Sequence, residues 1–290
     1  MSYKTPFQNW PTGAWPSYST DGSQIVFTDS GQLWIVATPT KSNPHPTATA
    51  LTSLSGVNAS RPDWSWNPNW IAFSGTAGGE SYLYIVSPSD PANQVYRLNV
   101  VDIVSGDPYT QILYPSWYEN QGIFALAAVN YTKTASGPAP VILVIDLSDY
   151  SPGSTDPVYA GAVTDASQVY AGRPTVSPDG SQIAFAGNQG SFNQQHNQIW
   201  IVEPDSPSGP IQLDPDQGRS PNWSPDGASI VFESNRGGSS YQVFLIPASG
   251  GVVTPLTDPS YDANHPEWSR DGTSIVFNSL GGGIYSFEAP

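Results

Sequence analysis

The sequence predicts an all-β protein in which six four-stranded sheets, the blades, form one closed ring, a six-bladed β-propeller. One phrase, built from proline, an aromatic residue, serine and Asp-Gly, recurs six times along the chain. The first prolines of successive copies lie 45 to 59 residues apart, a period that suits one four-stranded blade. The chain also holds 29 Pro and 27 Gly, which favours short strands joined by tight turns.

Four copies of the repeat are strong and two are degenerate. In a strong copy, such as residues 220–232, the phrase continues through Asp-Gly into an Ile-x-Phe strand. The copies that begin at Arg61 and Tyr114 lack the Asp-Gly pair but keep the proline and the tryptophan. The six marking prolines are Pro16, Pro62, Pro115, Pro174, Pro221 and Pro266.

Each repeat predicts four strands in a fixed order. The marking proline begins the inner strand, because proline lacks an N–H group and is tolerated at a strand start. Asp-Gly then favours a hairpin turn into a β-branched and aromatic second strand. Third strands are expected at Gln32–Val36, Tyr82–Val86, Val141–Ile145, Gln198–Val202, Tyr241–Ile246 and Ile284–Phe287. Weaker fourth strands end in Leu51-Thr52, Arg97-Leu98, Gln212-Leu213 and Leu256-Thr257.

The last repeat predicts how the ring closes. It stops at Pro290 after its third strand, whereas Lys4–Phe7 precedes the first repeat and resembles the fourth-strand segment Val253–Leu256. We therefore expect an N-terminal strand to complete the last blade, which removes two open sheet edges. The predicted blades cover residues 8–52, 53–99, 100–165, 166–213, 214–257 and 258–290 with 1–7, in a single domain 1–290.

The residues that the repeat keeps are expected to be structural. Asp-Gly recurs at fixed spacing, but a hairpin turn needs these residue types without any metal, because Asp caps the turn and Gly accepts a positive φ. The aromatic residues at one position of the inner strand are expected to pack between neighbouring blades, rather than to stack on sugars. They are Tyr18, Trp64, Trp117, Trp223 and Trp268.

Charge and composition exclude several classes of function. The formal net charge is −15 with only 9 Lys and Arg, so few cations are available to bind nucleic acid or an anionic membrane. No apolar run approaches the roughly 20 residues that span a bilayer, so we expect no membrane insertion. The absence of Cys excludes disulfides, thiolate catalysis and Cys-based zinc sites.

The low content of charged residues predicts an extracytoplasmic protein. Charged residues make up 11% of the chain, against about 25% in typical soluble domains. Met1–Pro6 lacks the basic start and apolar stretch of a signal peptide. Two interpretations stay open: a periplasmic or secreted protein whose signal peptide was removed, or a cytoplasmic protein.

The variable positions of the repeat predict the functional site. Loops that enter the inner strand, and loops that join the second and third strands, gather at one mouth of a propeller channel. The residues before the marking prolines are therefore placed at this mouth: Trp15, Arg61, Tyr114, Arg173, Ser220 and His265. The second set of loops adds Asp29, Glu80, Tyr131, Lys133, Asn188, Gln194, His196, Glu233, Asn235 and Arg236.

Arginine residues near the mouth indicate an anion-binding site, because guanidinium binds carboxylate or phosphate through paired hydrogen bonds. The predicted cluster is Arg61, Arg173, Arg219 and Arg236. The alternative is that these arginines pair within the protein, with Asp63, Glu267, Asp216 and Glu233. The longest loops, residues 127–140 and 187–197, are expected either to overhang the mouth or to be mobile.

Two further functions stay open. The chain contains no nucleophile elbow, zinc-protease motif or phosphate-binding glycine loop. A hydrolase or lyase would use His265, His196 and Glu233 or Glu267 as an acid/base or metal site. A lectin would use Trp10, Trp15 and Trp34 as sugar platforms. The acidic loops lack the ligand spacing of a dedicated calcium loop, so we expect no cofactor beyond incidental Ca²⁺.

The phrase Pro-x-Trp-Ser-Pro-Asp-Gly, followed by Ile-Ala-Phe and Ile-Trp-Ile-Val, resembles the repeat of TolB-type propellers, also called PD40 or WD40-like repeats. The resemblance covers nearly the whole chain. It implies a six-bladed propeller of the kind found in periplasmic, secreted and peptidase-associated proteins; in TolB the propeller binds protein partners. We therefore expect a monomeric, non-enzymatic module that binds a protein, peptide or other ligand at the channel mouth.

Overall fold

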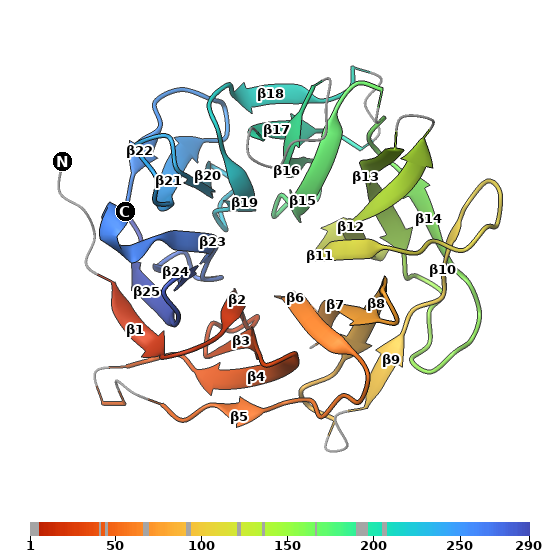
Figure 1. Ribbon diagram of the computed structural model, residues 1–290, viewed down its shortest axis with the longest axis horizontal. Helices are drawn as coiled ribbons and strands as arrows, with labels where there is room; N and C mark the ends of the chain where they lie inside the picture. Colours follow the sequence, from red (N-terminus) through yellow and green to blue (C-terminus); the bar gives the residue numbers. More distant parts are fainter. Residues whose placement is uncertain are drawn as a thin grey trace.

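Six sheets surround a central channel in the computed structural model (Figure 1), as the repeat predicts. The structure describes residues 6–40, 42–43, 46–65, 70–90, 94–120, 123–134, 137–165, 167–189, 197–204 and 208–290. The inner strand of each blade lines the channel, and the other strands follow outward in chain order. Among these residues, no helix has the length and apolar character needed to cross a membrane.

The first blade contains β2 (Ala14–Tyr18), β3 (Gln24–Asp29), β4 (Gln32–Ala37) and β5 (Thr49–Ala50). The second blade contains β6 (Asn58–Trp64), β7 (Ile71–Ala77), β8 (Glu80–Val86) and β9 (Val95–Arg97). The third blade contains β11 (Ile112–Asn120), β12 (Ile123–Thr134), β13 (Gly137–Asp146) and β14 (Val158–Ala162), with β10 (Val100–Asp102) outside them. The fourth blade contains β15 (Tyr170–Val176), β16 (Ile183–Asn188), β17 (Gln198–Val202) and β18 (Ile211–Asp214). The fifth blade contains β19 (Arg219–Trp223), β20 (Ser229–Ser234), β21 (Gln242–Pro247) and β22 (Thr254–Pro255). The sixth blade contains β23 (Ala263–Trp268), β24 (Ser274–Ser279), β25 (Ile284–Glu288) and β1 (Phe7–Trp10). A 3-10 turn, η2 (Pro259–Tyr261), precedes β23.

The third blade differs from the prediction in two ways. It carries a fifth strand, because β10 pairs in parallel with the outer strand β14. We expected residues 127–140 to form a loop. Residues 127–134 and 137–140 belong instead to β12 and β13, which pair from Ala125 opposite Asp146 to Thr134 opposite Gly137. The Asn, Thr and Pro in this segment obscured its strand character, although Val129 and Tyr131 are typical of strands.

The N-terminal strand closes the ring, as expected from the incomplete last repeat. β1 pairs antiparallel with β25, and Phe7 lies opposite Ser286 (Figure 1). The pairing segment begins at Phe7 and continues to Trp10, whereas we expected residues 1–7 to supply it; residues 1–5 lie outside the described part. Trp10 explains the shift, because its ring packs against Phe27 of the first blade, 6.3 Å away, and joins the closing strand to the next blade.

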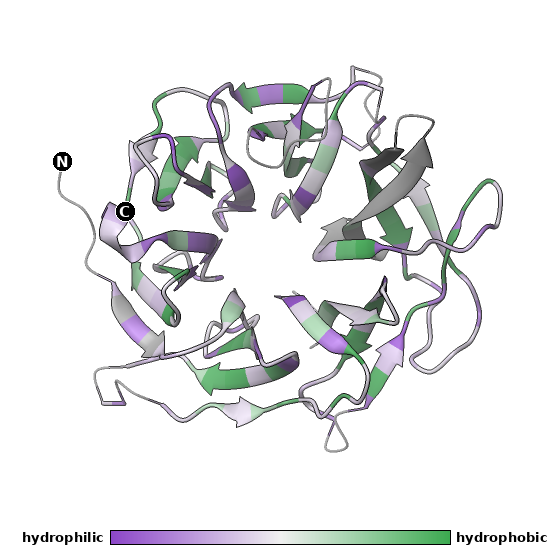
Figure 2. Ribbon diagram, in the orientation of Figure 1, coloured by the Kyte–Doolittle hydropathy of each residue, from purple (hydrophilic) through white to green (hydrophobic). Residues whose placement is uncertain are grey.

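The core lies between neighbouring blades. The five repeated aromatic residues are at most 7% exposed, which confirms their structural role. Trp223 of β19, for example, packs in one cluster with Ile199 of β17 in the preceding blade. Figure 2 shows the complementary pattern: hydrophobic residues fill the blades, and hydrophilic residues mark inner strands around the channel, including β6, β19 and β23.

The Asp-Gly pairs form turns, as expected. Asp179 accepts hydrogen bonds from the Ser177 hydroxyl at 2.6 Å and from the Ser181 backbone N–H at 3.0 Å. Gly180 has a φ of 71°, in the left-handed region that glycine adopts without a Cβ clash. The same arrangement recurs at Asp21, Asp226 and Asp271. These carboxylates are used within the turns.

Candidate functional site

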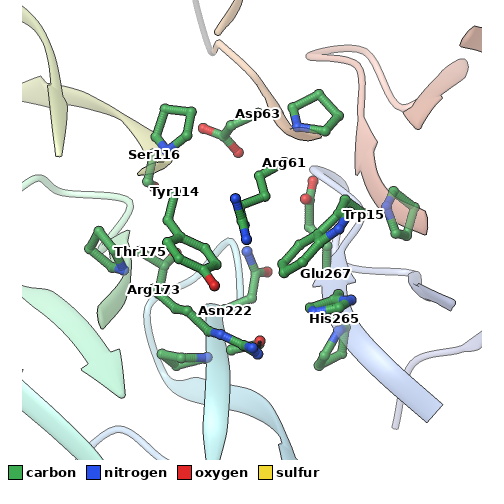
Figure 3. Close-up of a pocket in the computed structure, with 17 residues that line it drawn as sticks. Trp15, Arg61, Asp63, Tyr114, Ser116, Arg173, Thr175, Asn222, His265 and Glu267 are labelled. Atoms are coloured by element: carbon green, nitrogen blue, oxygen red, sulfur yellow. Dashed lines mark hydrogen bonds between the residues drawn. The ribbon is translucent and has the colours of Figure 1, made fainter. Parts of the chain in front are cut away.

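The six residues that precede the marking prolines meet at one pocket in the channel (Figure 3). We call these residues the mouth ring: Trp15, Arg61, Tyr114, Arg173, Ser220 and His265. The pocket has a volume of about 100 Å³. Its lining continues downward through the prolines to a second ring, formed by the residue after each proline. We call this second set the belt ring: Ser17, Asp63, Ser116, Thr175, Asn222 and Glu267. All of them except Ser17 line the pocket.

Every mouth-ring residue has a left-handed backbone. Their φ values lie between 51° and 58°, although none is glycine and each precedes a proline. Such conformations cost of order 1–3 kcal/mol and persist only where the surroundings enforce them. Each also coincides with an irregularity in the pairing of the inner and second strands, for example between Ser60 and Asp63. Irregularities of this kind redirect side chains, and here the side chains enter the pocket.

Hydrogen bonds from the preceding blade hold this backbone in place. The N–H of Tyr114 donates to the Ser74 hydroxyl at 3.1 Å, and the N–H of His265 donates to Glu233 at 2.6 Å. The N–H of Trp15 donates to Asn278 at 3.3 Å, across the junction of the last and first blades. The acceptors occupy one repeat position on the second strand. The strain is therefore maintained by contacts between blades.

One side of the mouth is aromatic and holds a guanidinium between two rings. The Trp15 ring stacks on His265 with 3.4 Å between centroids, and meets Tyr114 edge-on at 5.7 Å. The Arg61 guanidinium lies 4.1 Å from the Tyr114 centroid and 5.0 Å from that of Trp15, and Figure 3 shows it reaching between them. Among the residues described, no carboxylate lies within ion-pair distance of Arg61.

The other side of the mouth is organised by one buried carboxylate. Glu233 is fully buried, and its Oε1 accepts hydrogen bonds from Arg173 at 2.7 Å and from Arg219 at 2.6 Å. The Ser220 hydroxyl lies 3.1 Å from the same oxygen. Arg173 and Arg219, two of the arginines predicted to bind an anionic ligand, thus pair with Glu233 of the protein itself. Pairing within the protein was the alternative that the sequence left open. Glu233 supports the mouth ring from the second strand of its blade, where it lies opposite Arg219, and does not line the pocket.

Burial and charge set the protonation of the site. Burial lowers the pKa of His265 to about 4, so its imidazole is neutral at physiological pH. Burial alone would raise the pKa of Glu233, but the positive groups around it outweigh burial and lower this pKa. Burial would likewise raise the pKa of Tyr114, but Arg173 and Arg61 outweigh it and lower this pKa. The mouth therefore carries positive charge from arginine, not from histidine.

Several residues expected at the mouth do not line the pocket. Arg236 is held elsewhere: it pairs with Asp214, lies 3.7 Å from Asp216 and donates to the Gln217 carbonyl at 2.9 Å. Asp29, Glu80, Asn188 and Asn235 are also absent from the lining. Gln194 and His196, with most of the loop 187–197, lie outside the described residues, as do the side chains of Tyr131 and Lys133.

The belt ring joins the blades and was not predicted as a unit. Its side chains accept backbone N–H groups from the inner strand of the next blade: Ser17 from Trp64 at 3.1 Å, Asp63 from Trp117 at 2.7 Å, Asn222 from Trp268 at 2.9 Å, and Glu267 from Tyr18 at 2.8 Å. A signal was present in the sequence, because Asp63 and Glu267 are charged where the other repeats have Ser, Thr or Asn.

Within the described residues, no group of three or more His, Cys, Asp or Glu side chains is arranged to hold a metal ion. Of the three tryptophans proposed as sugar platforms, Trp15 alone lines the pocket. Trp10 and Trp34 pack instead against the core of the first blade.

Comparisons with known proteins agree on the fold. TolB from Acinetobacter baumannii is 18% identical with a TM-score of 0.65, over 92% of this chain and 57% of that chain, so this chain spans less than two thirds of that protein. A gluconolactonase from Xanthomonas campestris is 10% identical with a TM-score of 0.67, over 99% and 90% of the two chains. An oligogalacturonate lyase in complex with manganese is 13% identical with a TM-score of 0.54, over 100% and 99%.

Sequence comparison adds the family. No curated protein matches this sequence. Residues 154–289, which contain three of the strong repeats, match the family described as PD40, the TolB beta propeller domain. The six-bladed ring and the TolB structures show that the whole chain has the fold of a TolB-like six-bladed β-propeller, and the family match places PD40 repeats in residues 154–289.

Proposed function

We propose that the protein is a non-enzymatic binding module whose channel mouth receives a carboxylate group of a protein or peptide partner. The observation that carries the proposal is Arg61, a guanidinium at the mouth with aromatic rings beside it and, among the described residues, no carboxylate within ion-pair distance. Flat aromatic walls hold the guanidinium, and its N–H groups suit the two oxygens of a carboxylate.

The size of the pocket favours one small group over a whole small-molecule ligand. Sites for drug-sized ligands enclose about 300–1,000 Å³, whereas this pocket encloses about 100 Å³. The pocket is smaller than such sites and therefore suits a small group. A carboxylate at a chain end or side-chain tip fits this volume, with the rest of the partner lying on the rim.

The arrangement of His265 favours binding over acid/base chemistry. Its ring contacts Trp15 and Asn278, with Nδ1 2.7 Å from the Asn278 side-chain oxygen, and only its backbone N–H reaches Glu233. A general base is commonly oriented by a carboxylate. A hydrolase or lyase stays the alternative, because His196 lies outside the described residues. We further propose an extracytoplasmic location, from the few charged residues and the TolB likeness.

The test compares two peptides that differ in one group. An N-acetylated tripeptide with a free C-terminal carboxylate, and the same tripeptide as its amide, are titrated into the protein by calorimetry. We expect the acid to bind and the amide to bind at least tenfold more weakly. Arg61→Ala should reduce the affinity for the acid about 10- to 100-fold, as expected for the loss of a charged hydrogen-bond donor. Arg97→Ala is the matched control, because Arg97 is exposed and lies against Tyr82. Equal binding of acid and amide would contradict the proposal.

A further inference from the structure

The floor of the mouth pocket carries two carboxylates. Asp63 and Glu267 line the same pocket as Arg61 and Arg173, one ring deeper (Figure 3). Each uses one oxygen to join blades: Oδ2 of Asp63 accepts the Trp117 N–H, and Oε1 of Glu267 accepts the Tyr18 N–H. The Ser17 hydroxyl also donates to Oε1 of Glu267 at 3.1 Å. An anion bound by the arginines would therefore lie above two acidic groups.

The charges around this pair favour a single proton on it. Burial, and after it the negative charge of Asp63, raise the pKa of Glu267 to about 8. Burial also raises the pKa of Asp63 to about 6, although Arg270 opposes the rise. The other titratable group that faces the pair from below is the Tyr18 phenol on β2, whose pKa is raised by burial. From above, the pair faces Arg61, Arg173, His265 and the Tyr114 phenol, whose pKa is lowered by the two arginines against the effect of burial.

Arg270 is the nearest countercharge and is itself a departure from the repeat. It stands where the strong repeats at Ser177 and Ser224 continue with proline. Its guanidinium donates to the Trp64 carbonyl at 2.8 Å and lines a second, deeper pocket together with Asp63. One positive charge therefore balances one of the two carboxylates. When both are ionised, the floor carries a net negative charge beneath the mouth.

We propose that carboxylate binding at the mouth is coupled to the uptake of a proton by the Asp63–Glu267 pair at its floor. This inference rests on the proposed function and adds regulation to the same site. An anion above the pair disfavours a second negative charge below it, so binding promotes protonation, and by linkage protonation promotes binding. Each effect requires the other.

The sign of the pH dependence follows directly. As the pH rises through about 8, Glu267 loses its proton and the floor gains a negative charge, so affinity falls. The ligand carboxylate, with a pKa of roughly 3.5, and the arginines do not change charge between pH 6 and 9. His265 is already neutral there, because its pKa is about 4. We expect affinity to fall about fivefold from pH 6.5 to pH 9, the fall that a coupling of one pKa unit produces over this range.

The test measures the number of protons that the protein takes up when it binds the free-acid tripeptide. Calorimetry at pH 7.5 in HEPES and in Tris, which differ in ionisation enthalpy, should show net proton uptake on binding. Glu267→Gln keeps an oxygen for the Tyr18 N–H; it should bind the tripeptide without this uptake and with little change in affinity from pH 6.5 to 9. Asp63→Asn, which keeps an oxygen for the Trp117 N–H, is the second variant and should behave similarly if Glu267→Gln fails to fold.

The outcomes separate the two proposals. Binding by the wild-type protein without proton uptake, and with constant affinity across this pH range, would overturn the coupling and leave the carboxylate site standing. Uptake that persists in both variants would assign the proton to another group and would also overturn the coupling. No binding of the tripeptide at any pH would overturn the proposed function, and the coupling with it.

Discussion

The mouth ring and the belt ring lie two residues apart on the same six inner strands, yet their backbones and roles differ. Mouth-ring residues have positive φ, and their side chains enter the pocket. Belt-ring residues have no positive φ, and four of their side chains accept N–H groups from the next blade. The side chains of the mouth ring thus differ in chemistry from blade to blade, whereas those of the belt ring join neighbouring blades.

The two rings depend on each other through the junctions between blades. The mouth ring keeps its left-handed backbone because acceptors on the preceding blade bind its N–H groups, as Glu233 does for His265. The belt ring keeps those blades in register. A channel can therefore present different side chains at its mouth without losing its closure, provided that the supporting contacts remain. Variants that remove one of these contacts between blades at a time test how far the two rings depend on each other.

The largest expected effect comes from Glu233→Ala. The change leaves Arg173 and Arg219 without their buried countercharge and His265 without its backbone acceptor, which should cost about 3–5 kcal/mol. For a domain of this size that loss corresponds to a drop in melting temperature of about 10 °C in differential scanning calorimetry. Asp216→Ala is the control, because that side chain is 70% exposed and its ion pair with Arg236 should contribute less than about 1 kcal/mol. Equal melting temperatures would show that Glu233 does not support the ring.

A smaller effect is expected in the belt ring. Asn222→Ala removes the acceptor of the Trp268 N–H and should lower the free energy of unfolding by about 2 kcal/mol, the cost of an unsatisfied buried donor. Asn222→Ser should lose less, because Ser17 accepts the Trp64 N–H with its hydroxyl at the same repeat position. Urea denaturation measures both variants. If they were equally destabilised, the belt would not depend on these acceptors.

The smallest effect isolates the strain of the mouth ring. Arg61→Ala and Arg61→Gly both remove the side chain, but only glycine adopts a φ of 54° without a Cβ clash. We expect the glycine variant to be more stable than the alanine variant by about 1 kcal/mol in urea denaturation, the reverse of the usual order. At Ser17, which has no positive φ, alanine should be the more stable of the two. The usual order at Arg61 would argue against strain at the mouth.

Most of the fold was predictable because each repeat contains the same turn residues and the same pattern of strand residues. Asp-Gly at Asp179 and Asp226 predicted turns that the structure contains, and the incomplete last repeat predicted closure by an N-terminal strand. The β12–β13 hairpin was wrongly expected to be a loop, because polar residues interrupt its pattern and only pairing over its whole length stabilises it. Among the described residues, the parallel strand β10 has no counterpart in the other blades.

The candidate site was predictable in position but not in detail. The rule that function lies before the marking prolines placed six residues that the structure brings to one pocket. The loops between the second and third strands also suggested Arg236, which the structure pairs with Asp214 instead. The left-handed backbone of the mouth ring has no local signature, because Trp, Arg and Tyr before proline ordinarily predict extended backbone.

By itself, the sequence determined the number of blades, the order of their strands and the end of the channel where variable residues gather, since these follow from turn residues and periodicity. Only the tertiary structure decided which charges meet. Glu233 lies 14 residues from Arg219 and 60 from Arg173, and both arginines reach it because neighbouring inner strands converge on one axis. Arg61 stays outside that pairing, since ion pairs depend on distances of a few ångströms that the repeat period does not specify.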